Sequence, residues 1–143
     1  MSDARLAGPD DLPALLELRR RVFVEEQGVP VEIEQDHLDR LAVHAVARDG
    51  NGQVVGTGRL VVGADGTARI GRMAVAPEAR GSGTGAAVLA VLEAAAARAG
   101  CRRAVLHAQV QAIGFYRRAG YAAEGEPFDD AGIPHVAMAR DLS

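Results

Sequence analysis

Lysine is absent from this sequence of 143 residues, and all 16 of its basic residues are arginines. The absence excludes a Schiff-base lysine as a catalytic group, and it excludes the lysine on which a Walker A phosphate loop depends. Cysteine is scarce as well: Cys101 is the only one, so no disulfide can form within the chain. Aromatic residues make up 3% of the chain, which leaves most of the packing to small aliphatic side chains.

The charge balance and the hydropathy pattern exclude two kinds of partner. A net charge of −3 without a basic tail argues against binding of nucleic acid through phosphate neutralisation. No apolar run approaches the ~18 residues that a membrane-spanning helix needs, and the first residues lack the basic start and apolar core of a signal peptide. We therefore expect a cytoplasmic protein without membrane or nucleic acid partners, folded as a single domain over residues 1–143.

Turn residues and hydrophobic periodicity predict helices and strands in a mixed order. Asp49-Gly50-Asn51-Gly52 is typical of a hairpin turn, and Gly100 is a natural helix end. The predicted helices cover residues 10–26, 34–41, 84–99 and 110–119. The predicted strands cover residues 3–7, 42–48, 53–62, 67–76, 102–108, 121–126 and 133–140. This order predicts an α/β fold of the mixed α+β type, a three-layer sandwich with helices on both faces of a central, mostly antiparallel sheet.

The stretch VAPEARGSGTGA at residues 75–86 has the form of a backbone cradle for phosphate. Its three glycines at alternate positions follow Arg80 and precede the predicted 84–99 helix, so backbone N–H groups and the positive helix end can converge on an anion. The missing lysine excludes a Walker A loop. A dinucleotide fingerprint fits the glycines formally, but it requires an acidic ribose partner about 20 residues later, and no acidic residue stands between Glu93 and Glu124.

A third kind of cradle also fits. Arg80-Gly81-Ser82-Gly83-Thr84-Gly85 matches the arginine/glutamine-x-x-glycine-x-glycine/alanine loop, and here the sequence resembles the GNAT superfamily of acyl-CoA-dependent N-acetyltransferases. The strand RMAV (72–75) and the helix after the loop match its acetyl-CoA motif in type and order. FYRRAGY (115–121) resembles a later segment of that superfamily, while RVFVEEQ (21–27) and GIPH (132–135) resemble an ElaA-like branch. The resemblance implies a GNAT-like fold and acetyl-CoA as the acyl-donor substrate, with no metal.

The same resemblance implies how the donor is bound. The glycine loop would hold the pyrophosphate of coenzyme A, and Arg80 would add a charge-assisted contact. The preceding strand, splayed from the next parallel strand, would meet the pantetheine by strand addition. Gln109 stands where the superfamily often has Asn, and it could bond the pantetheine or cap the 110–119 helix. The residues expected to contact acetyl-CoA are Met73, Ala74, Val75, Arg80, Gly81, Ser82, Gly83, Thr84, Gly85, Ala86, Gln109, Phe115 and Tyr116.

The implied reaction is direct attack of an amine on the acetyl carbonyl. A backbone N–H near Val75 is our candidate for stabilising the oxyanion. Tyr116 is our candidate acid or hydrogen-bond donor beside the sulfur, although an aromatic residue on an amphipathic helix can also belong to the core. Three side chains are candidate bases, namely Glu26, His135 and His107, because histidine titrates near neutral pH and Glu26 ends the first predicted helix. A solvated Glu26, structural histidines and an ordered-water base are the alternatives.

The acceptor is the least determined part of the prediction. Residues 25–39 contain six acidic residues and no arginine. If this segment borders the cleft, its charge favours a cationic acceptor, so we expect a small basic amine or a lysine-like side chain of a peptide. A solvated acidic face explains the pattern as well. A non-catalytic acyl-CoA-binding module with the same fold is the alternative to an enzyme, and either a monomer or a homodimer is compatible with the sequence.

Overall fold

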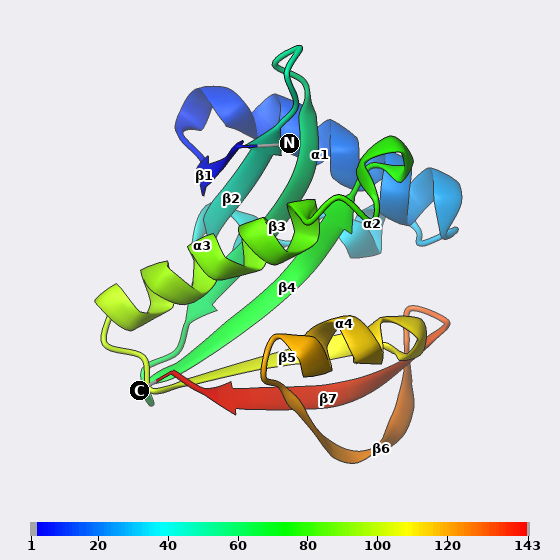
Figure 1. Cartoon of the computed structure of the whole chain (residues 1–143). Coiled ribbons are helices and arrows are strands. Elements are labelled where there is room, and N and C mark those ends of the chain that lie inside the picture. Colours follow the sequence, from blue (N-terminus) through cyan, green and yellow to red (C-terminus); the bar gives the residue numbers. More distant parts are fainter. Residues whose placement is uncertain (1–2, 143) are drawn as a thin grey trace.

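The computed structural model of the protein describes residues 3–142, through which a single seven-stranded sheet runs (Figure 1). The strand order is β1-β2-β3-β4-β5-β7-β6, and every neighbouring pair is antiparallel except β4 and β5. The strands are β1 (Asp3–Leu6), β2 (Val43–Arg48), β3 (Val54–Val62), β4 (Thr67–Val75), β5 (Arg103–Gln109), β6 (Ala122–Asp130) and β7 (Ile133–Asp141). The predicted mixed, mostly antiparallel sheet is confirmed.

Helices cover both faces of this sheet, as predicted. In Figure 1, α3 and α4 lie in front of the sheet and α1 lies behind it. The helices are α1 (Leu12–Arg19), the π-helical turn η2 (Arg20–Glu26) that continues it, α2 (Val31–Glu34), α3 (Thr84–Arg98) and α4 (Ile113–Arg118). Short 3-10 turns are η1 (Pro9–Asp11), η3 (His37–Arg40), η4 (Pro77–Ala79) and η5 (Val110–Ala112). Along the described residues 3–142, no helix combines the length and the apolar character needed to cross a membrane.

The helix predicted over residues 34–41 is wrong as a single element. The chain instead forms α2 and η3, which are separated by extended backbone at Gln35 and Asp36. Asp36 causes the break, because its carboxylate accepts a hydrogen bond from the Leu38 N–H at 3.1 Å and caps η3. The last hairpin is also longer than predicted, since β6 continues to Asp130.

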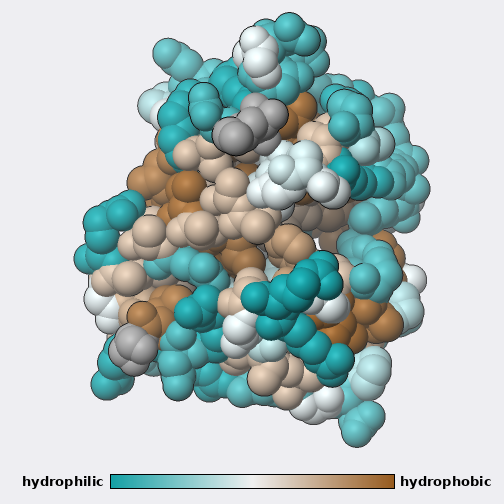
Figure 2. Space-filling model, viewed as in Figure 1, coloured by the Kyte–Doolittle hydropathy of each residue, from teal (hydrophilic) through white to brown (hydrophobic). Residues whose placement is uncertain are grey.

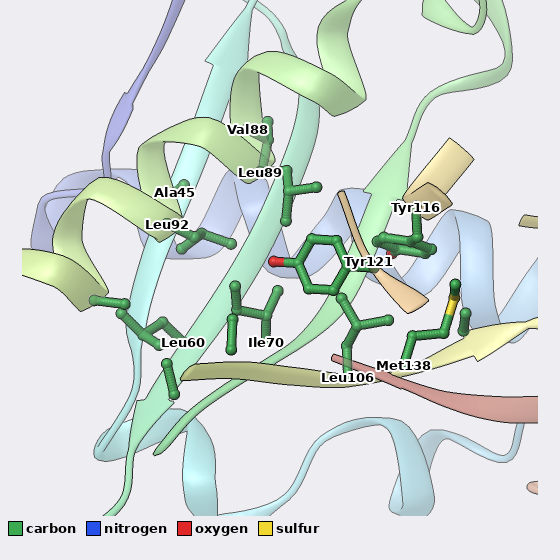
Figure 3. Packing of buried hydrophobic residues seen from close by; sticks show 14 of the residues in the cluster. Ala45, Leu60, Ile70, Val88, Leu89, Leu92, Leu106, Tyr116, Tyr121 and Met138 are labelled. Atoms are coloured by element: carbon green, nitrogen blue, oxygen red, sulfur yellow. The ribbon is translucent and has the colours of Figure 1, made fainter. Parts of the chain in front are cut away.

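Two apolar clusters fill the space between the sheet and the helices. In the larger one, Leu89 of α3 and Tyr116 of α4 lie with Tyr121 over Ile70 and Leu106 of the sheet (Figure 3). The smaller cluster holds α1 and η2 against the other face. Its buried members are Leu15, Leu18, Val22, Val46, Val54, Val55, Ala74 and Ala76.

The centre of β3 lets α3 approach the sheet closely, because it carries glycines where α3 crosses. A Cβ added to Gly56 would lie 2.6 Å from Cγ2 of Thr84, and one added to Gly58 would lie 2.5 Å from Sδ of Met73 and 2.8 Å from Cδ1 of Leu92. All three distances are far below van der Waals contact. The positions of α3 and of the glycine loop that precedes it therefore depend on Gly56 and Gly58 of β3 being glycines, which have no Cβ.

A β-bulge interrupts β4 in front of that loop. The register between β3 and β4 shifts between Thr57 and Arg59, so that Arg72 and Met73 together stand opposite Gly58. Arg72 has a φ of +50°, in the left-handed region that residues other than glycine rarely adopt. Bulges bend a strand and redirect its side chains, and they are frequent next to active sites. This one lies at the start of the RMAV stretch.

Candidate active site

The two parallel strands of the sheet separate after a short paired region. Their ladder consists of Thr67 with Arg103, Ala68 with Ala104 and Arg69 with Val105, although β4 and β5 both run on beyond it. The gap between them opens into a cleft of about 1160 Å³. In the space-filling view, the surface is hollowed between the regions of α3 and α4 (Figure 2). The splayed strands that the resemblance implied are therefore present.

The cleft has two halves that differ in the elements that line them. The half that we call the cofactor half is formed by residues 73–86 together with Phe115 and Tyr116 of α4. The other, which we call the acceptor half, is formed by side chains of the segment 22–38 together with Arg59, Arg72, His107, Gln109 and His135. The N-terminal end of α3, a helix of 15 residues, lies at the cofactor half.

The backbone of Val75 faces the gap between the strands. Ala76 donates its N–H to the Val55 carbonyl at 2.8 Å, and Val75 is the Cα partner of Gly56. Since hydrogen-bonded and non-hydrogen-bonded pairs alternate along an antiparallel ladder, the N–H and C=O of Val75 point away from β3. The ladder to β5 has ended at Arg69, so this backbone borders the open cleft, as a strand edge that binds pantetheine must.

The glycine loop has the backbone geometry expected of an anion cradle. Gly81 has a φ of +79° and Gly83 a φ of +85°, so both adopt the left-handed conformation that residues with a Cβ avoid. Gly83 directly precedes α3, whose first N–H groups carry the positive end of the helix dipole. A Cβ on Gly85 would lie 3.3 Å from Phe115 and 3.5 Å from Val75, which brings α3, α4 and β4 together at this point.

Two of the predicted loop contacts involve side chains that already have other neighbours. The Ser82 hydroxyl lies 2.9 Å from Oγ1 of Thr84, and it also donates to the Ala79 carbonyl. Thr84 is only 2% exposed and packs toward Gly56. A contact of either residue with a ligand in the cleft would therefore come from the backbone. Gly81, Gly83, Gly85 and Ala86 line the cleft directly.

Arg80 and Glu26 form a bidentate ion pair across the cleft. The Nη1 and Nη2 of Arg80 each donate to one carboxylate oxygen of Glu26 at 2.8 Å, and Nε donates to the Val75 carbonyl at 3.0 Å. The hydrogen bonds from Arg80 lower the pKa of the Glu26 carboxyl below its ordinary value. A carboxylate held in this way is a weak proton acceptor, so the structure joins two predicted site residues in an arrangement that the sequence did not suggest.

Tyr116 lies at the boundary between the core and the cleft. Its side chain is 7% exposed and packs edge-to-face against Phe115 and Tyr121, and it also lines the cleft. Burial raises the pKa of the phenol to about 12. The hydroxyl therefore stays protonated at neutral pH and can donate a hydrogen bond. Both interpretations of Tyr116 are thus partly realised, since the ring belongs to the core and the residue borders the cleft.

Gln109 bridges the cleft to the segment after α1. Its Nε2 donates to Oε1 of Gln27 at 2.8 Å, and its own Oε1 accepts from Gln111. Of the two uses expected from sequence, the helix cap is not formed, because Gln109 precedes η5 without a side-chain cap hydrogen bond. Gln27 was not among the predicted site residues, although it is the last residue of the RVFVEEQ stretch. Its role is visible only in the fold, where it contacts Gln109 of β5.

The two candidate histidines lie on neighbouring strands around Phe128. His135 stacks on Phe128 at 6.2 Å between ring centroids, and His107 meets the same ring edge-on at 4.9 Å. Nδ1 of His135 lies 2.7 Å from the Ile133 carbonyl, which can only accept, so in the neutral ring Nδ1 carries the proton and Nε2 holds the lone pair. His107 is exposed, with its Nδ1 3.9 Å from Asp130.

The acidic segment, residues 25–39, does not present the carboxylates of residues 34–39 to the cleft as unpaired negative charge. Arginines from three other elements reach into it, and residues 34–39 form a closed network with them. Arg19 of α1 donates to Glu34 at 3.0 Å and to Asp39 at 2.8 Å, and both Arg19 and Glu34 are almost fully buried. Arg59 of β3 donates to Asp36 at 2.7 Å, and its hydrogen bonds lower the pKa of that carboxyl. The electrostatic premise for a cationic acceptor is therefore wrong for these three carboxylates.

Arg72 completes this network from the β4 bulge. Its Nε donates to the Glu34 carbonyl at 3.0 Å, and its Nη2 donates to the Ile33 carbonyl at 3.2 Å and to Asp36 at 3.3 Å. The left-handed bulge residue thus ties β4 to α2. Sequence analysis missed Arg59 and Arg72, because a strand arginine gives no local sign that its partner lies more than twenty residues away. Within residues 3–142, no three His, Cys, Asp or Glu side chains are grouped as metal ligands would be.

Comparison with known proteins agrees with this geometry. Residues 13–142 match the family described as "Acetyltransferase (GNAT) domain". The uncharacterized N-acetyltransferase YjcF of Bacillus subtilis is 42% identical over 125 residues, which are 87% of this chain and 88% of the relative.

Two solved structures extend the agreement to the fold. An acyl-CoA N-acyltransferase from Pseudomonas aeruginosa superposes with a TM-score of 0.84 and 33% identity, over 98% of this chain and 99% of that one. Escherichia coli ElaA superposes with a TM-score of 0.84 and 27% identity, over the same shares of the two chains. The protein therefore belongs to the GNAT family of acyl-CoA N-acyltransferases, and its structural neighbours include the ElaA protein that the sequence resembles.

Proposed function

We propose that the protein transfers an acetyl group from acetyl-CoA to the nitrogen of a primary amine by direct attack. The observation that carries the proposal is the convergence of three features on one cleft. These are the splayed β4–β5 gap with the Val75 backbone at its edge, the left-handed glycine loop at the start of α3, and the protonated phenol of Tyr116. Together they supply what an extended amide chain, a pyrophosphate and a thioester sulfur each need.

In this proposal the acetyl-CoA pyrophosphate binds to the N–H groups of residues 81–86 and to Arg80. The pantetheine lies along β4 at Met73 to Val75, with Phe115 as an apolar neighbour. The thioester then lies beside Val75 and Tyr116. The backbone approach is possible because the glycines present no Cβ to the ligand.

The chemistry requires three groups at the thioester. The neutral amine attacks the carbonyl carbon, and the Val75 N–H stabilises the oxyanion that forms. The C–S bond then breaks, and Tyr116 donates its proton or a hydrogen bond to the departing thiolate. A thiol of this kind has a pKa near 8.5, so the contribution of Tyr116 is moderate.

His135 is our choice for the base that removes the proton from the attacking nitrogen. Its Nδ1–H is committed to the Ile133 carbonyl, which leaves the lone pair on Nε2 to accept a proton directly or through a water. His107, which is exposed and lies beside Asp130, is the second choice. We do not give this role to Glu26, because its carboxylate is bound by Arg80 and its pKa is lowered.

The acceptor in this proposal is a small basic amine or a lysine-like side chain. Glu26, at the boundary of the two halves of the cleft, is the carboxylate that supports this choice. Two measurements test the function. Acetyl-CoA and CoA should raise the melting temperature of the protein by binding the native state. A panel of primary amines should then release free thiol from acetyl-CoA. Binding of CoA without thiol release for any amine would indicate a non-catalytic acyl-CoA-binding module instead.

A further inference from the structure

Three of the five N–H donors of the Arg80 guanidinium are already used within the protein. Its Nη1 and Nη2 are used by the two oxygens of Glu26, both at 2.8 Å, and its Nε is used by the Val75 carbonyl at 3.0 Å. Paired fork geometry of this kind is the strongest form of arginine–carboxylate contact. The cation that the proposed function assigns to the cofactor pyrophosphate is therefore occupied by an internal carboxylate.

A pyrophosphate competes with Glu26 for the same side chain. It carries more negative charge than a carboxylate, and it would also be held by the N–H groups of the loop, so it can displace Glu26 from Arg80. After this exchange, Glu26 no longer has Arg80 as its partner, and its carboxylate lies near the bound pyrophosphate. The two nearest arginines on η2 are each paired with another carboxylate, since Arg21 is 3.4 Å from Glu78 and Arg20 is 3.1 Å from Glu25.

The other carboxylates that line the cleft do not have this property. Glu34 is 2% exposed and bound by the equally buried Arg19, and Asp130 lies 3.9 Å from the histidine His107. Neither is paired with a group that the cofactor needs. Glu26 is also linked through Arg80 to the Val75 carbonyl, which places its carboxylate near the residue proposed to hold the oxyanion.

We propose that Glu26 determines acceptor specificity by binding the ammonium group of the amine, and that acetyl-CoA makes Glu26 available by taking Arg80 from it. The proposal rests on the proposed function and deepens it, since it names an ammonium-bearing acceptor and the residue that recognises it. The Arg80–Glu26 pair is then a closed state of the cleft, and each substrate replaces one partner of the pair. Neutralising Glu26 should consequently affect the two substrates in opposite directions.

The first experiment measures CoA binding by isothermal titration calorimetry in the wild type and in the Glu26→Gln variant. The variant should bind CoA roughly two- to fivefold more tightly, because an exposed ion pair no longer competes. Glu25→Gln is the matched control, since it removes the same charge one residue away from a carboxylate paired with Arg20. Unchanged or weaker CoA binding in Glu26→Gln overturns the exchange. In an Arg80→Gln background, Glu26→Gln should give no gain, which separates competition from a general charge effect.

The second experiment measures thiol release with butylamine at saturating acetyl-CoA. Glu26→Gln should raise the KM of the amine about tenfold, because a charge-assisted contact to the ammonium that binds before deprotonation is lost. An unchanged amine KM overturns the recognition role. If the wild type releases no thiol with any amine, the proposed function fails, whereas the calorimetric result still decides whether Glu26 and the pyrophosphate exchange on Arg80.

Discussion

The cofactor half of the cleft comes mainly from one continuous stretch, residues 73–86, whereas the acceptor half is assembled from arginines and carboxylates on separate elements. In the first, glycines and a helix end make the geometry, and two exposed ion pairs, Arg80–Glu26 and Glu78–Arg21, connect it to η2. In the second, Arg19, Arg59 and Arg72 fix residues 33–39 through contacts between distant parts of the chain. The comparison indicates that the cofactor half depends on backbone shape and the acceptor half on long-range charge pairing.

Removing the buried cation of the acceptor half should have the largest effect. Arg19→Ala leaves Glu34 charged, buried and without its main partner, so we expect the free energy of unfolding to fall by about 3–5 kcal/mol. Urea denaturation measures the loss. Arg20→Ala is the control, because Arg20 is 42% exposed and its pairs with Glu17 and Glu25 are solvated. If Arg19→Ala lowers the free energy of unfolding by less than ~1 kcal/mol, the ion-pair network around Glu34 does not stabilise the acceptor half.

The corresponding change for the cofactor half is made in β3, beneath α3, and acts through packing. Gly58→Ala places a methyl group 2.5 Å from Sδ of Met73 and 2.8 Å from Leu92, and α3 or Met73 must move. We expect a loss of about 1–3 kcal/mol in unfolding free energy, together with weaker CoA binding. Gly71→Ala is the matched control in the neighbouring strand, because an added Cβ there has no atom within 4 Å. Equal stability of the two variants would contradict the close approach of α3.

The same contrast explains what the sequence could predict. The glycine loop and its following helix are local patterns, and the structure has both, whereas the splayed strand before the loop was implied only by the family resemblance. The acidic segment was misjudged because its partners, Arg19, Arg59 and Arg72, lie on elements that only the folded sheet brings near. The helix predicted over residues 34–41 failed for a related reason, since Asp36 caps η3 and also pairs with Arg59.

The catalytic residues were predicted only in part, because their positions follow from local sequence but their partners do not. Position within a motif suggested Tyr116, and its raised pKa and its place on the cleft are consistent with a donor. Position at a helix end suggested Glu26 as a base, but helix ends do not reveal a bidentate partner 54 residues away. Local sequence therefore indicates which residues reach the cleft more reliably than it indicates their protonation or their partners.

Tyr116→Phe tests the part of the cofactor half that α4 contributes. We expect turnover to fall about tenfold or more, equivalent to ~1.4 kcal/mol of barrier, while the affinity for CoA changes little. Steady-state thiol release and calorimetry with CoA measure the two quantities. Tyr121→Phe is a suitable control, because that hydroxyl donates to Glu93 at 2.8 Å and should affect stability rather than turnover. Full turnover in Tyr116→Phe would remove the phenol from the mechanism.

The smallest expected effect concerns alkaline pH, where the missing lysines are an experimental advantage. Arginine stays charged there, so the only two tyrosines, Tyr116 and Tyr121, dominate the titration. The pKa of Tyr116 is about 12 in the folded protein against ~10 when unfolded, so the folded state holds this proton more tightly. The stability linked to Tyr116 is therefore fully present below pH ~10 and is lost as the pH rises toward 12, by about 1 kcal/mol near pH 11.

Urea titrations of the wild type and of Tyr116→Phe across this pH range measure that contribution. The variant should lose stability less steeply than the wild type above pH ~10, while at neutral pH the linkage adds nothing to the difference between them. Tyr121 remains in both proteins and cancels in the comparison, as does Cys101. The near-ultraviolet absorbance of tyrosinate gives an independent reading of the same proton. Parallel pH profiles for the two proteins would mean that Tyr116 is more open to water than its 7% exposure indicates, and would weaken its assignment as a protonated donor at the thioester.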